Sequence, residues 1–139
     1  MTPQDIQLLA RRLDRLMRRL NAALHPRAQA MDKEKVGALG GMVLMELADR
    51  GPLPLAVLSA EMGRDKSQMT RLVQMLEGKG HVARSADAKD RRVSLIALTP
   101  RGEAFVRDVE MILGEVLEEI LSPLGEAERR AFLATLGTL

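Results

Sequence analysis

The chain has 139 residues, a net charge of +2 and no cysteine. This length suits one domain with its own core, and the lack of cysteine excludes disulfides, thiolate metal sites and cysteine nucleophiles. No apolar run of roughly eighteen residues and no signal-peptide pattern occur, so we expect a cytoplasmic protein without a membrane partner.

The charge is distributed unevenly along the chain. Residues 1–63 have a net charge of +2, residues 64–101 of +5 and residues 102–139 of −5. A basic middle segment is typical of a surface that faces a polyanion, although ordinary solvated charge explains the same distribution.

The first third of the chain has the pattern of two helices. Thr2-Pro3-Gln4-Asp5 is a helix start, with a capping hydroxyl, a proline and an acid in the first turn. Apolar residues follow at helical spacing as far as Ala23, and His25-Pro26 predicts the end of this helix. A second helical pattern uses Val36, Leu39, Val43 and Leu47 and stops at Gly51-Pro52. Gly40-Gly41 in its middle indicates either a close helix crossing or simple tolerance.

Two short helices come next. Pro54 opens the first and Gly63 closes it, and Asp65 is a good N-cap for the second. The second helix ends at Gly78-Lys79-Gly80, and its apolar face consists of Met69, Leu72, Val73 and Leu76. Two short helices joined by a tight turn predict a helix-turn-helix.

A hairpin and two further helices complete the predicted elements. Short strands over Val82–Arg84 and Val93–Leu98 flank a polar loop with a basic tip. Thr99-Pro100 starts a helix that is apolar on two faces, and a last helix starts at about Glu126. A helix with two apolar faces needs more than one partner, and its main stripe is Val106, Val109, Leu113, Val116 and Ile120.

Together these elements predict a mainly α fold with a small β-hairpin wing, a winged helix-turn-helix. We expect a single domain over residues 1–139, with a DNA-binding lobe at about residues 35–100. The N- and C-terminal helices, at about residues 1–25 and 100–139, would form the dimerisation region of a homodimer.

The polar face of the second short helix suits DNA. At about 100° per residue, the side opposite its apolar face holds Ser67, Arg71 and Gln74, flanked by Gln68 and Thr70, with Arg64 and Lys66 adding charge near the N-terminus. Arginine can bond guanine bidentately, glutamine adenine, and Ser or Thr a phosphate or base. Any exposed helix face is polar, so the helix-turn before it and the basic hairpin after it are what favour DNA reading.

The hairpin tip gathers cations around one acid. Lys89, Arg91 and Arg92 surround Asp90, a density of charge that suits a minor groove. A solvated surface loop is the alternative interpretation.

These stretches resemble the MarR family of transcriptional regulators over nearly the whole chain. The resemblance is carried by Leu58–Leu72, Leu76–Gly80, Asp87–Arg92 and Leu98–Gly102. It implies a dimeric regulator of double-stranded operator DNA, usually a repressor, here of its own or a neighbouring promoter. It also implies that Arg92 enters the minor groove while Asp90 orients its guanidinium. Many members of the family lose DNA affinity on binding small, often aromatic molecules.

An effector pocket of stacked rings is not expected here, because the only aromatic residues are Phe105 and Phe132. An adaptable apolar cavity for a small apolar or aromatic-acid effector is the alternative, and its candidate lining is Met17, Met42, Met45 and Met111. Core packing explains methionines at helical spacing equally simply.

The remaining function classes find little support. His81 stands where the resemblance leads us to expect an apolar residue, and we interpret it as a partly buried or surface histidine, with ligand or pH sensing as the alternative. His25 is the only other histidine, so no metal site and no cofactor are expected. No nucleophile–base set or phosphate-binding glycine loop predicts an enzyme. The main rival is a winged-helix module that binds proteins instead of DNA.

Overall fold

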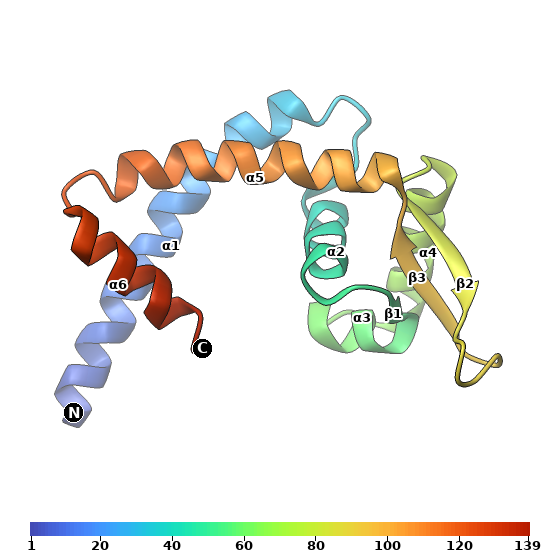
Figure 1. The fold of residues 1–139 in the computed structure, drawn as a ribbon, viewed down its shortest axis with the longest axis horizontal. Coiled ribbons are helices and arrows are strands. Elements are labelled where there is room, and N and C mark those ends of the chain that lie inside the picture. Colours follow the sequence, from blue (N-terminus) through green and yellow to red (C-terminus); the bar gives the residue numbers. More distant parts are fainter. The chain divides into compact units, whose positions relative to one another are not determined.

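The computed structural model describes residues 1–139 and contains six helices and three strands (Figure 1). In chain order they are α1 (Pro3–Met31), α2 (Gly37–Arg50), β1 (Leu53–Pro54), α3 (Leu55–Met62), α4 (Lys66–Gly78), β2 (Val82–Ala86), β3 (Ser94–Leu98), α5 (Pro100–Ile120) and α6 (Glu126–Leu136). This order confirms the predicted mainly helical fold with a hairpin wing. No helix combines the length and the apolar character that a membrane span requires.

The chain divides into two compact units. The smaller unit comprises Met1–Ala28 and Met111–Leu139, and the larger unit comprises Gln29–Glu110. The helix-turn-helix, the sheet and the first half of α5 all belong to the larger unit, whereas α1 and α5 each contribute residues to both.

The larger unit has one hydrophobic core, shared by its helices and its sheet. The buried residues that form it are Val36, Val43, Leu44, Leu47, Leu53, Leu58, Met69, Val73, Leu76, Val82, Ile96 and Val106. Gly40 is also buried, and a Cβ atom there would lie 3.4 Å from Leu76 Cδ2. The same Cβ atom would lie 2.8 Å from Val36 Cγ1 at the start of α2, whereas 3.4 Å is an ordinary van der Waals distance, so the approach of α4 does not by itself require glycine here.

The sheet is antiparallel, with the strand order β1-β3-β2. In the β2–β3 hairpin, Val82 pairs with Leu98 at the end near α4 and α5, and Ala86 pairs with Ser94 at the end near the tip. Leu53 of β1 pairs with Ile96 on the other side of β3. The hairpin strands lie close to their predicted bounds, but β1 was not predicted. Two residues carry no alternating pattern, and proline is tolerated there because β1 is an edge strand.

The predicted end of the first helix at His25-Pro26 is wrong, because α1 continues to Met31 with Pro26 inside it. An interior proline removes a helical hydrogen bond and costs about 3 kcal/mol. The next residue, Arg27, contributes compensating contacts within the smaller unit: its Nη2 lies 3.0 Å from Glu119 Oε1 and its Nη1 lies 4.0 Å from Glu115 Oε2. Exposed ion pairs contribute about 0–1 kcal/mol each, so these contacts offset only part of the cost of the proline.

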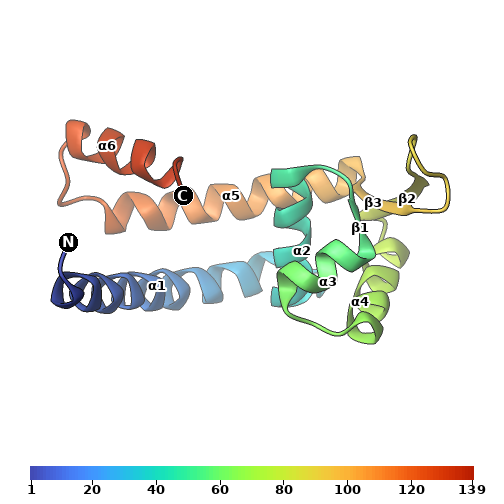
Figure 2. The same ribbon diagram turned by 90° about the horizontal axis from the view of Figure 1, so that it is seen from below.

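The smaller unit buries little of its own apolar surface. Val116 is its one buried residue, while Ile6, Leu9 and Leu13 on α1 are each about half exposed, at 53%, 52% and 52%. A turn after α5 reverses the chain into α6 (Figure 2), and Arg129 fastens this turn by donating to Leu124 O and Glu118 Oε2. The unit therefore presents an apolar face that the single chain does not cover.

The start of α5 lies against the residue that leads into β2. The Thr99 amide donates to His81 O at 3.1 Å, and the Gly102 amide donates to Thr99 Oγ1 at 3.1 Å. A Cβ atom on Gly102 would lie 2.1 Å from His81 O, which is far inside van der Waals contact. Only glycine allows this approach.

We therefore expect Gly102→Ala to destabilise the protein by about 1–3 kcal/mol, because the added methyl group forces α5 and His81 apart. Chemical denaturation measures the change. Gly78→Ala is the matched control, since a Cβ atom there meets nothing within 4 Å, and its stability should stay level or rise slightly. Equal stability of Gly102→Ala and the wild type would contradict the close packing.

Candidate nucleic-acid interface

The helix α4 is fixed by its cap and by its buried face. The Asp65 side chain accepts a hydrogen bond from the Gln68 amide at 2.8 Å, which confirms the predicted N-cap. Met69, Val73 and Leu76 are fully buried and Leu72 is half-buried, so the predicted apolar face is also confirmed. The orientation of the opposite face follows directly from this packing.

That opposite face, which we call the α4 polar face, consists of Lys66, Ser67, Gln68, Thr70, Arg71 and Gln74. All of these side chains are exposed except Thr70, which is half-buried. The Thr70 hydroxyl donates to the Lys66 carbonyl at 2.7 Å, so its one donor is already used within the helix. Lys66, Ser67, Thr70 and Arg71 together line a shallow hollow of the surface.

The cations near this face have no acidic partners in the chain. Arg64, Lys66 and Arg71 are exposed and form no ion pair, whereas Arg84 on β2 is paired with Glu77 at the end of α4. Unpaired cations beside exposed amide and hydroxyl groups can bind phosphates and base edges at once.

The hairpin that follows α4 has an ordered tip. The Asp87 amide donates to Val93 O at 2.9 Å and the Val93 amide donates to Asp90 O at 3.0 Å, while the Lys89 amide donates to Asp87 Oδ1 at 2.9 Å. These local bonds give the loop between β2 and β3 a defined shape. Lys89 and Arg91 are exposed on it and unpaired.

Asp90 and Arg92 form a bidentate ion pair at this tip. Arg92 Nε lies 3.0 Å from Asp90 Oδ1 and Arg92 Nη2 lies 3.1 Å from Asp90 Oδ2, and the Arg92 amide also donates to Oδ1. The Arg92 side chain donates to Asp90 and holds the pKa of that carboxyl below its ordinary value, with the backbone bond contributing in the same direction. The Arg92 side chain is 90% exposed, so the pair orients a guanidinium that faces solvent.

The four candidate pocket methionines do not form a common lining in either unit. Met42 and Met45 belong to the larger unit, where Met42 is exposed and Met45 packs against the core. Met17 and Met111 belong to the smaller unit and are both exposed. The hollow on the α4 polar face has no methionine in its wall.

His81 is more buried than expected. It is 2% exposed, its ring lies 5.6 Å from that of Phe105, and its Nε2 lies 2.7 Å from Glu34 Oε2. No sequence pattern singled out Glu34, because its contact with His81 joins positions far apart in the chain. No group of three or more His, Asp or Glu side chains could hold a metal ion.

Comparisons with known proteins agree with this geometry. The model of the MarR family matches residues 41–94, from α2 to the first residue of β3. A transcriptional regulator from Thermotoga maritima is similar in structure, with a TM-score of 0.73 and 25% identity over 95% of this chain and 91% of that one. A MarR family protein from Bacillus stearothermophilus has a TM-score of 0.70 and 25% identity over 99% and 94% of the two chains.

A third similar structure is that of BpsR from Bordetella bronchiseptica, whose DNA binding is described as regulated by 6-hydroxynicotinic acid. It has a TM-score of 0.64 and 26% identity, and the similarity covers 93% of this chain and 90% of that one. The family model thus matches the helix-turn-helix and hairpin, and the structural similarity extends over nearly the whole chain. The chain is similar to the MarR family over residues 41–94 and has the winged helix-turn-helix fold of these transcriptional regulators.

Proposed function

We propose that this protein is a sequence-specific DNA-binding regulator that acts as a homodimer and represses its own or a neighbouring promoter. The observation that carries the proposal is the α4 polar face, where Arg71 and Gln74 are exposed and unpaired on a helix whose other face is fixed by core packing. It requires no enzyme activity and no cofactor.

In this proposal some residues on and beside the α4 polar face contact base edges and others contact phosphates. Arg71 and Gln74 read base edges in the major groove, because each can form two parallel hydrogen bonds to one base. Lys66 and Arg64 contact phosphates near the helix N-terminus, where free backbone N–H groups add to the attraction. Thr70 contributes its hydroxyl oxygen as an acceptor, since its donor is bonded to Lys66 O.

The wing completes the proposed interface. Arg92 enters the minor groove, and Asp90 fixes the direction of its guanidinium. The pair uses two of the five guanidinium N–H groups, so three remain for acceptors on DNA. Lys89 and Arg91 add attraction to phosphates that does not depend on sequence.

The rival class is a module that binds an acidic protein through the same cations. Charge alone does not separate the two partners. The exposed Gln68 and Gln74 beside Arg71 favour DNA, because side chains that match base edges add nothing to a purely electrostatic contact.

A small-molecule effector is the part of the proposal that rests on similarity alone. BpsR is described as regulated in its DNA binding by 6-hydroxynicotinic acid. A small apolar or aromatic acid acts here in the same way if it binds one conformation of the dimer more tightly than the other.

The first prediction separates base reading from phosphate contact. Arg71→Ala and Gln74→Ala should narrow the free-energy gap between operator and random DNA by about 1–3 kcal/mol, because each removes a bidentate contact to one base. Lys66→Ala should weaken both DNAs similarly and lower the salt slope by about one unit. Fluorescence anisotropy with an operator selected from a random duplex library measures both quantities.

Arg107→Ala is the control for this series, because Arg107 is an exposed arginine on α5, outside α4 and the wing. It should leave the gap between operator and random DNA unchanged. Equal losses on the two DNAs for Arg71→Ala would assign Arg71 to phosphate contact, and no salt-dependent binding by the wild type would favour the protein-binding module.

The second prediction concerns the wing pair. Arg92→Ala should lose most operator affinity and lower the salt slope by about one unit. Asp90→Ala should weaken operator binding, because it frees the Arg92 guanidinium. The affinity for random DNA should stay level or rise, because the variant removes a negative charge near phosphate. Asp87→Asn is the matched control, since it removes a charge from the same loop and keeps an oxygen for the Lys89 amide. If Asp90→Ala tightened both DNAs by one factor, the orienting role would be wrong.

The third prediction concerns the homodimer. Ile6, Leu9 and Leu13 share one face of α1 and are half exposed, so we expect a second copy to cover them. Leu13→Lys should raise the dimer dissociation constant by at least about tenfold, as for a residue buried at an interface core. Analytical ultracentrifugation measures the change.

Leu8→Lys serves as the control, because Leu8 is 50% exposed but lies roughly 130° around α1 from that face. A folded, stable monomer of the wild type at micromolar concentration would refute the homodimer. A homodimer places its two recognition helices about 34 Å apart, which predicts an operator with two similar half-sites.

A further inference from the structure

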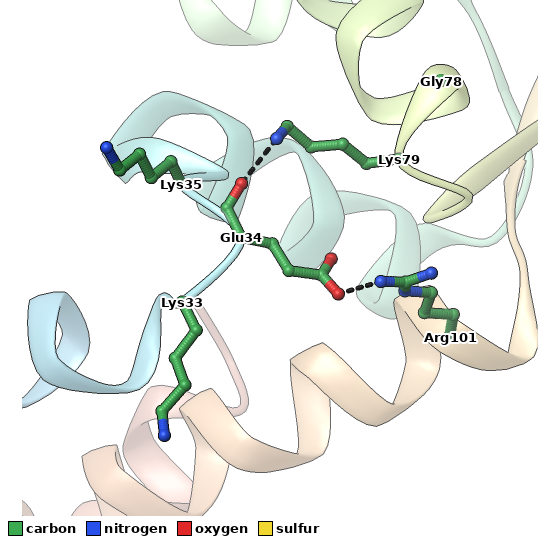
Figure 3. Close-up of a pocket in the computed structure, with 6 residues that line it drawn as sticks. All are labelled: Lys33, Glu34, Lys35, Gly78, Lys79 and Arg101. Carbon is green, nitrogen blue, oxygen red and sulfur yellow. Dashed lines mark hydrogen bonds and ion pairs between the residues drawn. The ribbon is translucent and has the colours of Figure 1, made fainter.

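Glu34 joins three parts of the larger unit from the loop between α1 and α2 (Figure 3). Its carboxylate lies against the guanidinium of Arg101 at the start of α5 and against His81 Nε2 at the root of the wing. Its carbonyl oxygen accepts a hydrogen bond of 2.6 Å from Lys79 Nζ, just after α4. No other acid in the chain pairs with residues at the end of α4, before β2 and in α5 together.

The carboxylate of Glu34 is the only acidic partner of the buried His81. The His81 side chain is 3% exposed, and neither ring nitrogen makes a hydrogen bond of acceptable geometry, so the 2.7 Å approach of Nε2 to Glu34 Oε2 is its one polar contact in the chain. A buried imidazole without a polar partner is costly. The charged groups that face this site are Glu34 itself, Arg101 from α5 and Lys79 from the end of α4. Glu34 is therefore the one group that can balance these cations.

The loop that presents Glu34 is held in a defined conformation. The Asp32 carboxylate accepts hydrogen bonds from the Val36 and Gly37 amides, both at 2.8 Å. Lys35 has a φ of 56°, which makes it the one residue other than glycine with a positive φ. A strained backbone persists where surrounding contacts demand it, and the residue next to it is Glu34.

His81 in turn determines where the wing leaves α4. Its amide donates to Leu76 O at 2.9 Å in the last turn of α4, and its carbonyl accepts from the Thr99 amide at the end of β3. These two backbone bonds place His81 between the end of α4 and the end of β3. A shift of the imidazole moves the root of β2 relative to α4.

We propose that Glu34 is a positioning residue for DNA reading: it fixes the end of α4 and the root of the wing against the start of α5 through Lys79, His81 and Arg101. This inference rests on the proposed DNA-binding function. Glu34 contacts no DNA in this scheme, and it acts by holding the α4 polar face and the wing tip in one relative geometry.

The hollow around Glu34 is consistent with this role. Its wall consists of Lys33, Glu34, Lys35, Gly78, Lys79 and Arg101, so one acid stands among four cations. The Arg101 guanidinium donates to Glu34 and holds the pKa of that carboxyl below its ordinary value, and His81 acts in the same direction. Glu34 therefore stays ionised at neutral pH and serves as an internal counter-ion for this cluster.

Two variants test the proposal, one that removes the charge of Glu34 and one that keeps it. Glu34→Gln removes a negative charge, so a purely electrostatic effect would tighten operator and random DNA alike. A positioning role predicts instead that the affinity for operator DNA falls by about tenfold, while the affinity for random DNA stays level or rises. Glu34→Asp keeps the charge but is shorter by one methylene group, so positioning predicts a loss close to that of Glu34→Gln.

Glu103→Gln is the matched control, because Glu103 is an exposed acid in the first turn of α5 and makes no ion pair. It should change operator and random DNA equally. The proposal is overturned if Glu34→Gln behaves like Glu103→Gln, or if Glu34→Asp binds operator as the wild type does.

A measurement without DNA separates this proposal from the function on which it rests. In the free protein, Glu34→Gln should speed hydrogen exchange at least about tenfold at the amides of His81 and Thr99, whose bonds join α4, the wing and α5. Amides within α3 and the unfolding midpoint should change little. If the two amides of Glu34→Gln exchanged as slowly as in the wild type, the positioning role would be refuted. If the wild-type protein bound no DNA, the proposed function would be refuted, and the exchange rates would still decide the role of Glu34 in the fold.

Discussion

The geometry of the larger unit depends on the close contact between His81 and the start of α5. Here the chain leaves α4, enters β2 and returns from β3, and the His81 carbonyl accepts from Thr99 while it lies against Gly102. A carbonyl this close leaves no room for any side chain at Gly102. The helix α4 is set by its cap and its buried face, and this backbone contact sets the root of the hairpin that follows α4 against the start of α5.

Local signals in the sequence predicted the elements around this contact well. Asp65 caps α4 and Thr99 caps α5, because each acts on an amide three residues away. The signals failed where distant residues decide the outcome. Pro26 is a strong local stop, yet α1 continues past it to Met31. Arg27, the next residue, pairs with carboxylates on α5. Glu34 and His81 are 47 positions apart, so no spacing rule reveals their contact.

The smaller unit shows the same limit in another form. Val116 of the predicted α5 stripe is buried within one chain, whereas Ile6, Leu9 and Leu13 on α1 are half exposed. The sequence pattern alone indicates that a partner is needed, but not which stripe it covers. Charge adds a constraint: five arginines lie on α1 between residues 11 and 19, whereas residues 102–139 have a net charge of −5. Arg27 and Glu119 show such a pair within one chain. Opposite charges on the terminal segments favour packing of α1 beside acidic helices, and salt weakens that preference.

Two acids stand where a protein built only to attract DNA would have none. Asp90 lies among the wing cations, and Glu34 lies among four cations behind the recognition helix. Each lowers the net positive charge of the larger unit, so under the proposed function each weakens nonspecific attraction to DNA. Each also holds an arginine in one direction, Arg92 at the tip and Arg101 at the root of the wing. Attraction grows with the number of cations, whereas discrimination between sequences requires that their positions be fixed. The placement of these two carboxylates therefore favours discrimination at the expense of attraction, which is the balance that a regulator of a few sites among many requires.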